Sequence, residues 1–484
     1  MSVDFLLSIW PWLLLLVLIA LNLAVSARVI LIKRDSHTAV NWLAIFWLAP
    51  FLGVALYWLL GINRIQRRAR RLRRKFRRSR TPTGATAPLS DMASAILATG
   101  AEHLTPLAQL GETITGNPLC PGNSVAPLMN GDQAYPVMMQ AIDEATQSVS
   151  LAMYIFENDQ AGNLFVAALG RAVARGVEVR VLVDDIGAHF TWRSIVGPLR
   201  QANVPVACFL RTLIPRYFAY ANLRSHRKIL VVDGRLGFTG GMNIGDGNCL
   251  HLRPAHPIRD LMFRMEGLIV SQMQKVFVED WSFTTGETLH GPRWFPTLVP
   301  HGPVLARGVS SGPDEDLEKL RFVLLGALNS AQQRVVIVTP YFLPDVGLIS
   351  ALNITALRGV QIDIVLPKFG DLRLVQWAST AQLWQVLEHG CRVWIDPDPF
   401  PHTKLMIVDG VWTLLGSGNW DARSLRLNFE FNIECYDRTL ARELEAAVDA
   451  TITRSERVTL TKLNQRPFPV KLRDGVARLF MPYL

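Results

Sequence analysis

The chain has 484 residues, half of them hydrophobic, and a formal net charge of +10 at pH 7. A single hydrophobic core stops growing at about 250–300 residues, so the length predicts two globular domains and additional elements. The positive charge does not indicate nucleic-acid binding, because 11 of the 50 lysines and arginines lie within residues 64–80. The other 39 basic residues are balanced by 40 acidic ones, and a nearly neutral body lacks the spread basic surface that binds a phosphate backbone.

The chain opens with two apolar stretches, Phe5 to Ala27 and Thr38 to Leu60, that contain no Asp, Glu, Lys or Arg. Each has 23 residues, and at about 1.5 Å per residue a helix of this length crosses a hydrocarbon core of roughly 30 Å. A cleavable signal peptide is the alternative, but the start MSVDF has no positive region and a second apolar stretch follows. We therefore expect residues 1–63 to form a two-helix transmembrane hairpin.

Residues 64–92 are expected to be a basic amphipathic segment followed by a linker. Because residues 64–80 contain eleven cations and no acid, the positive-inside rule places everything after Arg64 in the cytoplasm. The apolar residues of this segment recur at helical spacing, namely Ile65, Ala69, Leu72 and Phe76. Such a helix can lie on an anionic leaflet, and a stop-transfer cluster that only fixes topology is an equal alternative. The next residues, SRTPTGATAPLSDM, have the composition of a linker.

The body contains an internal duplication. Residues 141–184 and 327–366 share the order helix, apolar strand, helix, Arg-Gly-Val and second apolar strand. Alternating elements of this kind predict α/β layers around a buried sheet. We place the first domain at residues 93–300 and the second at residues 301–484.

The end of the chain, VKLRDGVARLFMPYL, predicts a helix with one apolar face made by Leu472, Val476, Leu479 and Phe480. An apolar helix face normally covers a core. We therefore expect this face to pack against the protein, with contact to a membrane as the alternative.

The same motif occurs once in each domain, as SHRKILVVDGRLGFTGGMN and as PHTKLMIVDGVWTLLGSGN. Its matching members are all 176 positions apart: His226 and His402, Lys228 and Lys404, Asp233 and Asp409, Gly240 and Gly416, Asn243 and Asn419. A His and a Lys two residues apart on a strand point to the same face, so they can act on one ligand. Asp-Gly predicts a tight turn, and the glycines are expected to let the backbone approach a bound group. Lysine and asparagine can donate to the oxygens of a phosphate.

These repeated residues are identified as the paired HKD motifs of the phospholipase D superfamily. The resemblance implies that both motifs form one active site, in which one histidine attacks phosphorus and becomes a phosphohistidine. The other histidine protonates the leaving alcohol and later deprotonates the incoming one. An imidazole can fill either role near neutral pH. On this resemblance the expected nucleophile is His226 and the expected acid and base is His402.

The resemblance also implies roles for the other motif residues. The expected catalytic set is His226, Lys228, Asp233, His402, Lys404 and Asp409, in which the two aspartates brace the turn and the motif lysine rather than react. Asn243 and Asn419 are expected to support the site. Asp260 and Glu430, one downstream of each motif, are expected to hold a histidine in the right tautomer, and ordinary strand-end acids are the alternative.

The similarity narrows to the bacterial cardiolipin synthases over nearly the whole chain, through YIFENDQAG, SHRK, DLMFRMEG and NWDARSLRLNFEFN. It implies two pseudo-symmetric α/β/α sandwich domains preceded by two transmembrane helices, with the catalytic domains on the cytoplasmic side of the bacterial inner membrane. It also implies that two phosphatidylglycerol molecules condense to cardiolipin with release of glycerol, at a surface of anionic lipids. No metal or other cofactor and no nucleic acid is expected, and the sequence makes no prediction of oligomeric state.

Other functions remain open at this point. A hydrolytic phospholipase D, in which water accepts the phosphatidyl group and phosphatidic acid is released, would use the same motifs. A nuclease is disfavoured by the neutral body, and a noncatalytic lipid-binding scaffold would not need two imidazoles. The first motif departs from the family pattern, because it is followed by GMNIGDGNC without the NxDxRS of the second. The two halves are therefore not expected to be equivalent.

Overall fold

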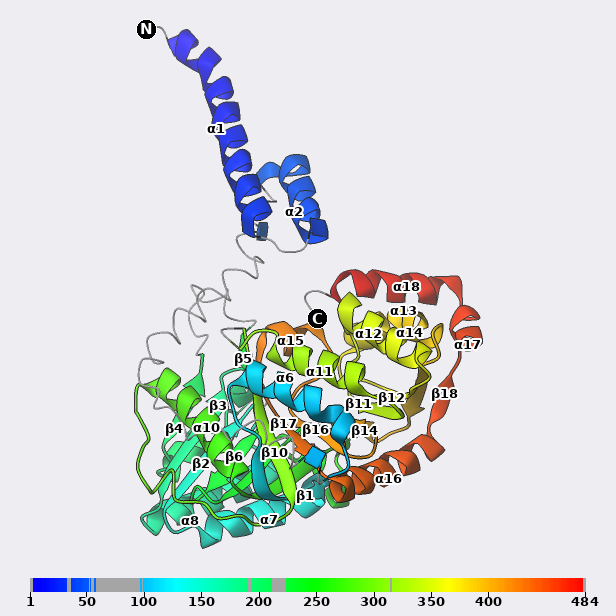
Figure 1. Ribbon diagram of the computed structural model, residues 1–484. Helices are drawn as coiled ribbons and strands as arrows, with labels where there is room; N and C mark the ends of the chain where they lie inside the picture. The colour runs from blue at the N-terminus through cyan, green and yellow to red at the C-terminus, as the bar shows by residue number, and fades with distance from the viewer. Residues whose placement is uncertain are drawn as a thin grey trace. The chain divides into compact units, whose positions relative to one another are not determined.

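The computed structural model describes residues 3–32, 36–51, 53, 56–57, 96–97, 99–189, 193–210, 223–313 and 316–481 (Figure 1). These residues fall into two units, residues 3–57 and residues 96–481. The basic segment and most of the linker expected between residues 64 and 92 lie outside the described residues, so those predictions are not addressed by the structure.

The N-terminal unit consists of two helices, α1 (Val3–Ile32) and α2 (Ser36–Leu48). Trp42 and Phe46 of α2 are buried against Val29 of α1. Within the described residues, α1 is the one helix long and apolar enough to cross a membrane, over Trp12–Leu31. The first expected span thus coincides with a suitable helix. The second expected span stays a prediction, because α2 has 13 residues and several positions after it lie outside the described residues.

The first half of the larger unit alternates strands and helices along the chain. Its elements are α6 (Thr105–Thr115), β1 (Cys120–Met129), α7 (Asn130–Glu144), β2 (Ser148–Met153), α8 (Gln160–Ala174), β3 (Glu178–Asp184), α9 (Val196–Gln201), β4 (Val206–Phe209), β5 (Arg224–Ser225), β6 (Ile229–Val232), β7 (Leu236–Gly240), β8 (Ile258–Arg259), β9 (Leu261–Gly267) and α10 (Ile269–Thr285).

The second half repeats this alternation and adds elements at its end. It contains β10 (Val304–Ser311), α11 (Lys319–Ser330), β11 (Arg334–Val338), α12 (Val346–Leu357), β12 (Gln361–Pro367), α13 (Arg373–Gln382), α14 (Trp384–Leu387), β13 (Arg392–Asp396), β14 (Phe400–Pro401), β15 (Leu405–Val408), β16 (Trp412–Gly416), α15 (Ala422–Arg426), β17 (Asn428–Tyr436), α16 (Arg438–Arg454), β18 (Glu456–Val458), α17 (Leu460–Asn464) and α18 (Phe468–Leu479).

One sheet runs through both halves. The strand order is β1-β9-β7-β6-β2-β3-β4 in the first half and β10-β17-β16-β15-β11-β12-β13 in the second, with β18 added at the outer edge. The two sets join where β1 pairs antiparallel with β10. The strands that follow the two motif lysines, β6 and β15, occupy the same place in each set. Both pair antiparallel with the strand that begins the duplicated segment, β2 or β11.

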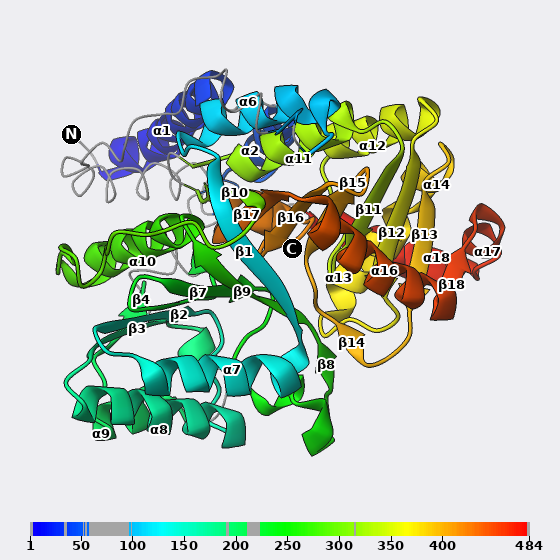
Figure 2. The ribbon, with the colours of Figure 1, turned by 60° about the horizontal axis from the view of Figure 1, so that its bottom comes forward.

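Helices cover both faces of the sheet. In the first half α7, α8 and α9 lie on one face and α10 on the other (Figure 2). Each half has its own outer core, and a third buried cluster contains side chains of α10 from the first half and α16 from the second. The result is a mixed α/β fold in which the two halves share hydrophobic core, because β-branched and large aliphatic residues fill the strands on both faces.

Two short strand pairs cross between the halves. β5 pairs in parallel with the start of β17, and β8 pairs in parallel with β14. As a result the backbone N–H of His226 donates to the carbonyl of Phe429 at 2.9 Å, and that of His402 donates to the carbonyl of Arg259 at 2.8 Å. Each motif histidine is therefore fixed to the backbone of the opposite half.

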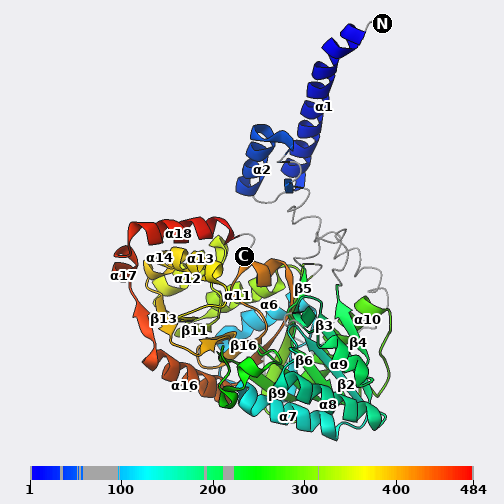
Figure 3. The ribbon, with the colours of Figure 1, turned by 180° about the vertical axis from the view of Figure 1, so that it is seen from behind.

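The expected packing of the C-terminal apolar face is wrong. Helix α18 lies along α13 (Figure 3), but it turns the small buried Ala477 and the buried Asp474 toward the protein. Leu472, Val476 and Leu479 are exposed. The helix was predicted correctly, and its apolar face points the other way.

Candidate active site

The two motif histidines are each held by an acid from the other half of the chain. The Nδ1 atom of His226 lies 2.9 Å from Oε2 of Glu430, and Nδ1 of His402 lies 2.8 Å from Oδ2 of Asp260. All four side chains are largely buried. The expectation that these acids orient histidines agrees with the contacts, and the exchange between halves is a feature that the sequence did not predict.

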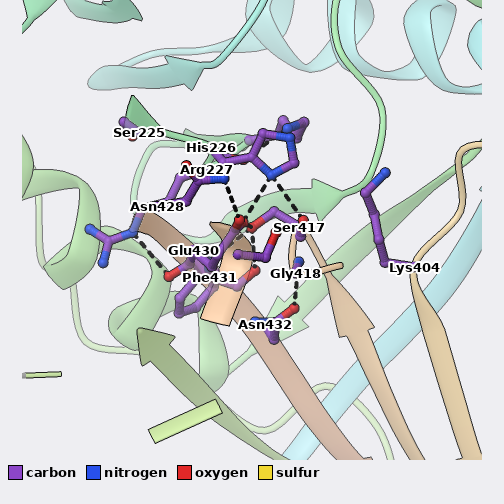
Figure 4. A network of polar contacts seen from close by, with 12 residues as sticks. Ser225, His226, Arg227, Lys404, Ser417, Gly418, Asn428, Glu430, Phe431 and Asn432 are labelled. Carbon is purple, nitrogen blue, oxygen red and sulfur yellow. Dashed lines mark hydrogen bonds and ion pairs between the residues drawn. The ribbon is translucent and has the colours of Figure 1, made fainter. Parts of the chain in front are cut away.

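The surroundings of His226 settle which ring nitrogen carries the proton. Its Nδ1 is also 3.0 Å from the backbone carbonyl of Ser417, which can only accept a hydrogen bond. Nδ1 therefore donates to both Ser417 and Glu430, and in a neutral ring the lone pair lies on Nε2 (Figure 4). Glu430 itself accepts from Oγ of Ser417 at 2.5 Å and from Nδ2 of Asn428 at 3.1 Å. This network fixes both the tautomer and the orientation of the imidazole.

The acid partners are held as carboxylates. Burial alone would raise the pKa of Glu430, but the charge and hydrogen bond of His226, together with Lys228, bring it below its usual value. Burial likewise opposes ionisation of Asp260, and the hydrogen bond and charge of His402 outweigh it so that the pKa is lowered. A carboxylate acceptor implies that Nδ1 of His402 is also a donor, which leaves its lone pair on Nε2.

The two motif lysines lie in the same buried cluster. The Nζ atom of Lys228 donates to the carbonyl of His226 at 2.8 Å, and Nζ of Lys404 donates to the carbonyl of His402. Burial lowers the pKa of Lys228 to about 7, and the charge of Lys404 adds to the effect. Burial lowers the pKa of Lys404 to about 8, against the opposing charges of Asp260 and Glu430. Since residues of both motifs act on one another, the motifs form one electrostatic site.

Burial and the neighbouring cations both oppose protonation of the imidazoles. Burial lowers the pKa of His226 to about 4, with Glu430 opposing the shift and Lys228 adding to it. Burial also lowers the pKa of His402, and the charge of Lys404 is the next cause. An anion bound between the lysines would offset these positive charges and favour protonation. The cluster thus suits an anionic ligand beside two imidazoles with free Nε2 lone pairs.

The motif aspartates lie away from this cluster. A four-residue strand separates Asp233 from Lys228, and another separates Asp409 from Lys404. The carboxylate of Asp233 accepts from the backbone N–H groups of residues 146, 147 and 148 at 2.7–2.9 Å. Asp409 accepts in the same way from residues 332, 333 and 334 at 2.8–2.9 Å. The aspartates therefore brace the chain at the starts of β2 and β11, which agrees with the expected bracing role. The expected contact with the motif lysines is not found among the described residues.

The motif glycines serve the sheet rather than a ligand. A Cβ atom on Gly240 would lie 2.3 Å from the carbonyl oxygen of Leu261, and one on Gly416 would lie 2.5 Å from that of Phe431. Both oxygens belong to the neighbouring strand. Close packing of the strands thus already requires glycine at both positions, and the approach of the backbone to a bound group stays a prediction.

The motif asparagines differ between the halves. Oδ1 of Asn243 accepts from the backbone N–H of Ile155 at 3.2 Å, whereas Oδ1 of Asn419 is buried and has no hydrogen-bond partner among the described residues. The segments that follow also differ. Asp421 caps helix α15 by accepting from the N–H of Ser424, and two short 3-10 turns stand in the corresponding region of the first half. The predicted inequivalence of the halves agrees with these differences.

Two tyrosines at matching places in the two halves were not singled out as site residues from the sequence. The ring of Tyr154 lies 4.8 Å from the ring of His226, and Nζ of Lys228 lies 5.1 Å from the same tyrosine. Tyr341 occupies the matching place in the second half and donates to Asp371 at 2.6 Å. Tyr154 directly follows β2 and Tyr341 lies three residues after β11, so their repetition at one point of the duplication was the available signal.

A cavity of about 280 Å³ opens beside Tyr341. Its walls come from the ends of β12 and β13 and from α13 and α17, and they are mainly apolar. Lys368, Lys462 and Arg466 contribute cations to the lining. Tyr341, which donates to Asp371, forms part of the cavity lining.

The chain resembles known proteins over almost its full length. The domain family described as the PLD-like domain of cardiolipin synthase matches residues 138–281 and 324–452. A cardiolipin synthase of Geobacillus sp. (strain WCH70) is 30% identical over 454 residues, covering 93% of this chain and 90% of that protein. The chain belongs to the bacterial cardiolipin synthase family. It is accordingly a phosphatidyltransferase of the phospholipase D superfamily and an enzyme of phospholipid biosynthesis.

Further relatives agree with this membership. The major cardiolipin synthase ClsA of Bacillus subtilis (strain 168) is 33% identical over 365 residues, covering 75% of this chain and 76% of that protein. A phosphatidylserine synthase from Haemophilus influenzae Rd KW20 has a TM-score of 0.61 at 16% identity, over 78% of this chain and 100% of that chain. This structural similarity shows that the two chains share a fold.

Proposed function

We propose that the chain transfers the phosphatidyl group of one phosphatidylglycerol to a second phosphatidylglycerol through a phosphohistidine, forming cardiolipin and releasing glycerol. The observation that carries this proposal is the pair of buried imidazoles, His226 and His402, each with Nδ1 bound to a carboxylate and Nε2 left as the reactive atom. Two lysines beside them supply positive charge for a phosphodiester. Two imidazoles are needed because one must bond to phosphorus while the other moves a proton.

In the first step Nε2 of His226 attacks the phosphorus of the donor lipid. In the bound complex, where the anionic phosphate beside the lysines favours protonation, His402 carries a proton on Nε2. The bond between phosphorus and the glycerol headgroup oxygen breaks, and that oxygen takes this proton. Lys228 and Lys404 hold the charge on the non-bridging oxygens, where negative charge must be stabilised. Asn243 and Asn419 support the same oxygens. Glycerol leaves, and the phosphatidyl group stays on His226.

In the second step a hydroxyl of the second phosphatidylglycerol attacks the phosphorus. Nε2 of His402, neutral after the first step, takes the hydroxyl proton, and the bond between His226 and phosphorus breaks. Both imidazoles return to their starting protonation states, so the cycle needs no external proton donor. Water in place of the lipid alcohol would give phosphatidic acid, which is the hydrolytic alternative.

The assignment of His226 as nucleophile is favoured by its surroundings. Its Nδ1–H has two acceptors, Glu430 and the carbonyl of Ser417, which keep the lone pair on Nε2. Its pKa of about 4 keeps that lone pair free of a proton at neutral pH. Nδ1 of His402 has one acceptor, Asp260. His402 acts as the acid in the first step and as the base in the second. Asp233 and Asp409 act on the reaction only through the turns that they brace.

The arrangement of the chain follows the same proposal. Residues 1–63 form a transmembrane hairpin in the bacterial inner membrane, residues 64–92 a basic segment and linker, and residues 93–300 and 301–484 two pseudo-symmetric α/β/α domains that face the cytoplasm. The matching strand orders of the two halves support the duplication, and the length and hydropathy of α1 support the membrane anchor.

Labelling of single introduced cysteines from outside intact cells should leave the body unlabelled, and labelling of body positions would refute this topology.

The reaction is tested with purified full-length protein in detergent and phosphatidylglycerol as the only lipid, without added metal. We expect cardiolipin and glycerol in equal amounts. Phosphatidic acid with glycerol and no cardiolipin would mean that water is the acceptor and that the hydrolytic alternative is correct.

The histidine roles are tested with His402→Ala, with His290→Ala as the matched control because His290 is exposed on a loop. His402→Ala should abolish turnover without changing expression or membrane insertion, and the control should keep full activity. Mass spectrometry of the peptide that contains His226 should detect the phosphatidyl adduct during turnover by the unaltered protein. An adduct on His402 instead would reverse the two roles, and full activity of His402→Ala would remove the mechanism.

A further inference from the structure

Helix α18 exposes an apolar ridge on its outer side. The ridge consists of Phe468, Leu472, Val476, Leu479 and Phe480, whose exposed fractions lie between 48% and 73%. Soluble proteins seldom gather large apolar side chains on one exposed helix face, and such a patch marks an interaction site. The ridge therefore needs an occupant.

The orientation of α18 is the reverse of that expected for a surface helix of a soluble protein. At about 100° per residue, Asp474 and Ala477 fall on one side, and the middle of the ridge falls on the opposite side. Asp474 and Ala477 are the buried residues of the helix. The ridge thus points directly away from the protein body.

The charges of α18 flank the ridge on both sides. By the same helical rotation, Lys471 and Arg478 lie along one border and Arg473 lies along the other. The one acid of the helix, Asp474, is buried and paired with Arg466 at 2.6 Å and with Arg473 at 2.7 Å. An apolar strip with cations on both borders and no exposed acid is the pattern of a helix that lies in an anionic membrane interface.

We propose that α18 docks in the headgroup region of an anionic bilayer, with the ridge in the acyl boundary and its cations at the lipid phosphates. A lipid bilayer, rather than a protein partner, is favoured by this charge arrangement. It is also favoured because α1 of the same chain is long and apolar enough to cross a membrane. Two exposed apolar residues of the loop before α13, Phe369 and Leu372, extend the same apolar character next to the helix on which α18 packs.

Docking in this way would bring lipid close to the histidine cluster. Tyr341 packs in the small apolar cluster that contains Ala477 of α18, and the next residue, Phe342, forms a β-bridge with Trp420, which follows the motif residue Asn419. The segment around Tyr341 therefore connects the docking helix with the second motif. The cavity beside Tyr341 is lined by Leu463 and Arg466, which lie just before α18. A phospholipid leaving the bilayer at α18 would thus meet an apolar cavity and a cationic site in succession.

The deciding experiment measures what covers the ridge, without using enzyme activity. A nitroxide is attached to Val476→Cys in the full-length protein, with the two partly exposed cysteines, Cys120 and Cys208, replaced by serine. The protein is placed in liposomes of phosphatidylglycerol and phosphatidylcholine. Electron paramagnetic resonance then compares access of oxygen, which concentrates in lipid, with access of a water-soluble nickel chelate. Leu164→Cys on α8 is the matched control, because Leu164 is also exposed on a helix.

We expect the label at position 476 to be open to oxygen and protected from nickel by at least about fivefold relative to the label at position 164. Equal nickel access at the two positions would show that the ridge faces water and would overturn the proposal. Protection from both reagents would show that protein covers the ridge, from a second copy or another segment of this chain, and would overturn it as well.

A second readout separates docking from catalysis. The double variant Leu472→Glu/Leu479→Glu should raise the apparent KM for liposomal phosphatidylglycerol at least about tenfold. Its turnover of dihexanoyl phosphatidylglycerol in detergent should stay unchanged, because a monomeric substrate needs no bilayer docking. Leu164→Glu should change neither value. Loss of turnover on both substrates, or on neither, would contradict the docking role, whereas failure of the proposed transferase reaction would leave the label result unaffected.

Discussion

Replacement of Glu430 by glutamine should impair the chemical step through His226. Glutamine keeps the size of the side chain, but its amide presents a donor where the carboxylate presents two acceptors. The carboxylate now accepts from Nδ1 of His226, Oγ of Ser417 and Nδ2 of Asn428. Either orientation of the amide therefore places a donor against a donor, at His226 or at Asn428. The imidazole loses either its partner or its fixed orientation.

The size of the effect follows from the second acceptor of His226. A hydrogen bond to a charged group contributes about 1.5–3 kcal/mol, which corresponds to a factor of about 10–150 in rate. In serine proteases a comparable change from aspartate to asparagine costs about 10⁴, because the imidazole adopts the wrong tautomer. Here the carbonyl of Ser417 still holds Nδ1 as the donor. We therefore expect kcat to fall about 100-fold rather than 10⁴-fold.

The measurement is kcat with phosphatidylglycerol, alongside the midpoint of thermal unfolding in detergent. Glu434→Gln is the matched control, because Glu434 lies on the same strand β17, is equally buried and pairs with Arg307 instead of a histidine. The control should lower the unfolding midpoint and leave kcat per folded molecule within about threefold. A fall of less than threefold for Glu430→Gln in folded protein would refute the role of this carboxylate.

Three further predictions concern the turn, the core and the lysines. Asp233→Ala should leave the backbone N–H donors of residues 146–148 without their carboxylate acceptor and cost about 1–3 kcal/mol of stability, seen as a lower unfolding midpoint with kcat per folded molecule unchanged. Arg307→Met should leave the buried carboxylate of Glu434 unpaired and cost about 3–5 kcal/mol, which denaturant unfolding will measure. The KM for phosphatidylglycerol should rise between pH 7 and pH 9. Burial lowers the pKa of Lys228 to about 7, so the cationic form that binds the phosphate is lost as the pH rises through that value.

Local patterns in the sequence predicted the parts of the site that local structure determines. The repeat at 176 positions identified the second His–Lys pair. The expected strand is absent at the pairs themselves, because His226 and Lys228 lie between β5 and β6, and His402 and Lys404 lie between β14 and β15. The Asp-Gly dipeptides predicted the turns, and the contacts of Asp233 with the backbone of residues 146–148 agree with the bracing role. The duplication likewise predicted alternating strands and helices, since apolar periodicity is a property of short windows of sequence.

The relations that the sequence did not predict join residues about 140–200 positions apart. The contact of His226 with Glu430 depends on the pairing of β5 with β17, and that of His402 with Asp260 depends on the pairing of β8 with β14. No local pattern encodes such a pairing, because strand pairing within one half and strand pairing between the halves would bury the same apolar residues. The direction of the α18 face was missed for a similar reason, because periodicity identifies a face without naming what covers it.

Each motif histidine pairs with an acid of the other half, and this exchange explains why the two halves depend on each other within one chain. Taken alone, the first half would hold His226 without Glu430, and it would hold Asp260 as a buried carboxylate without its imidazole partner. An unpaired buried charge is costly, and a histidine without an acceptor at Nδ1 has no fixed tautomer. Neither half therefore contains one complete pair, and each half depends on the other for both the orientation of its histidine and the neutralisation of its acid. The shared sheet through β1 and β10 holds the two halves in the register that these two histidine–acid contacts require.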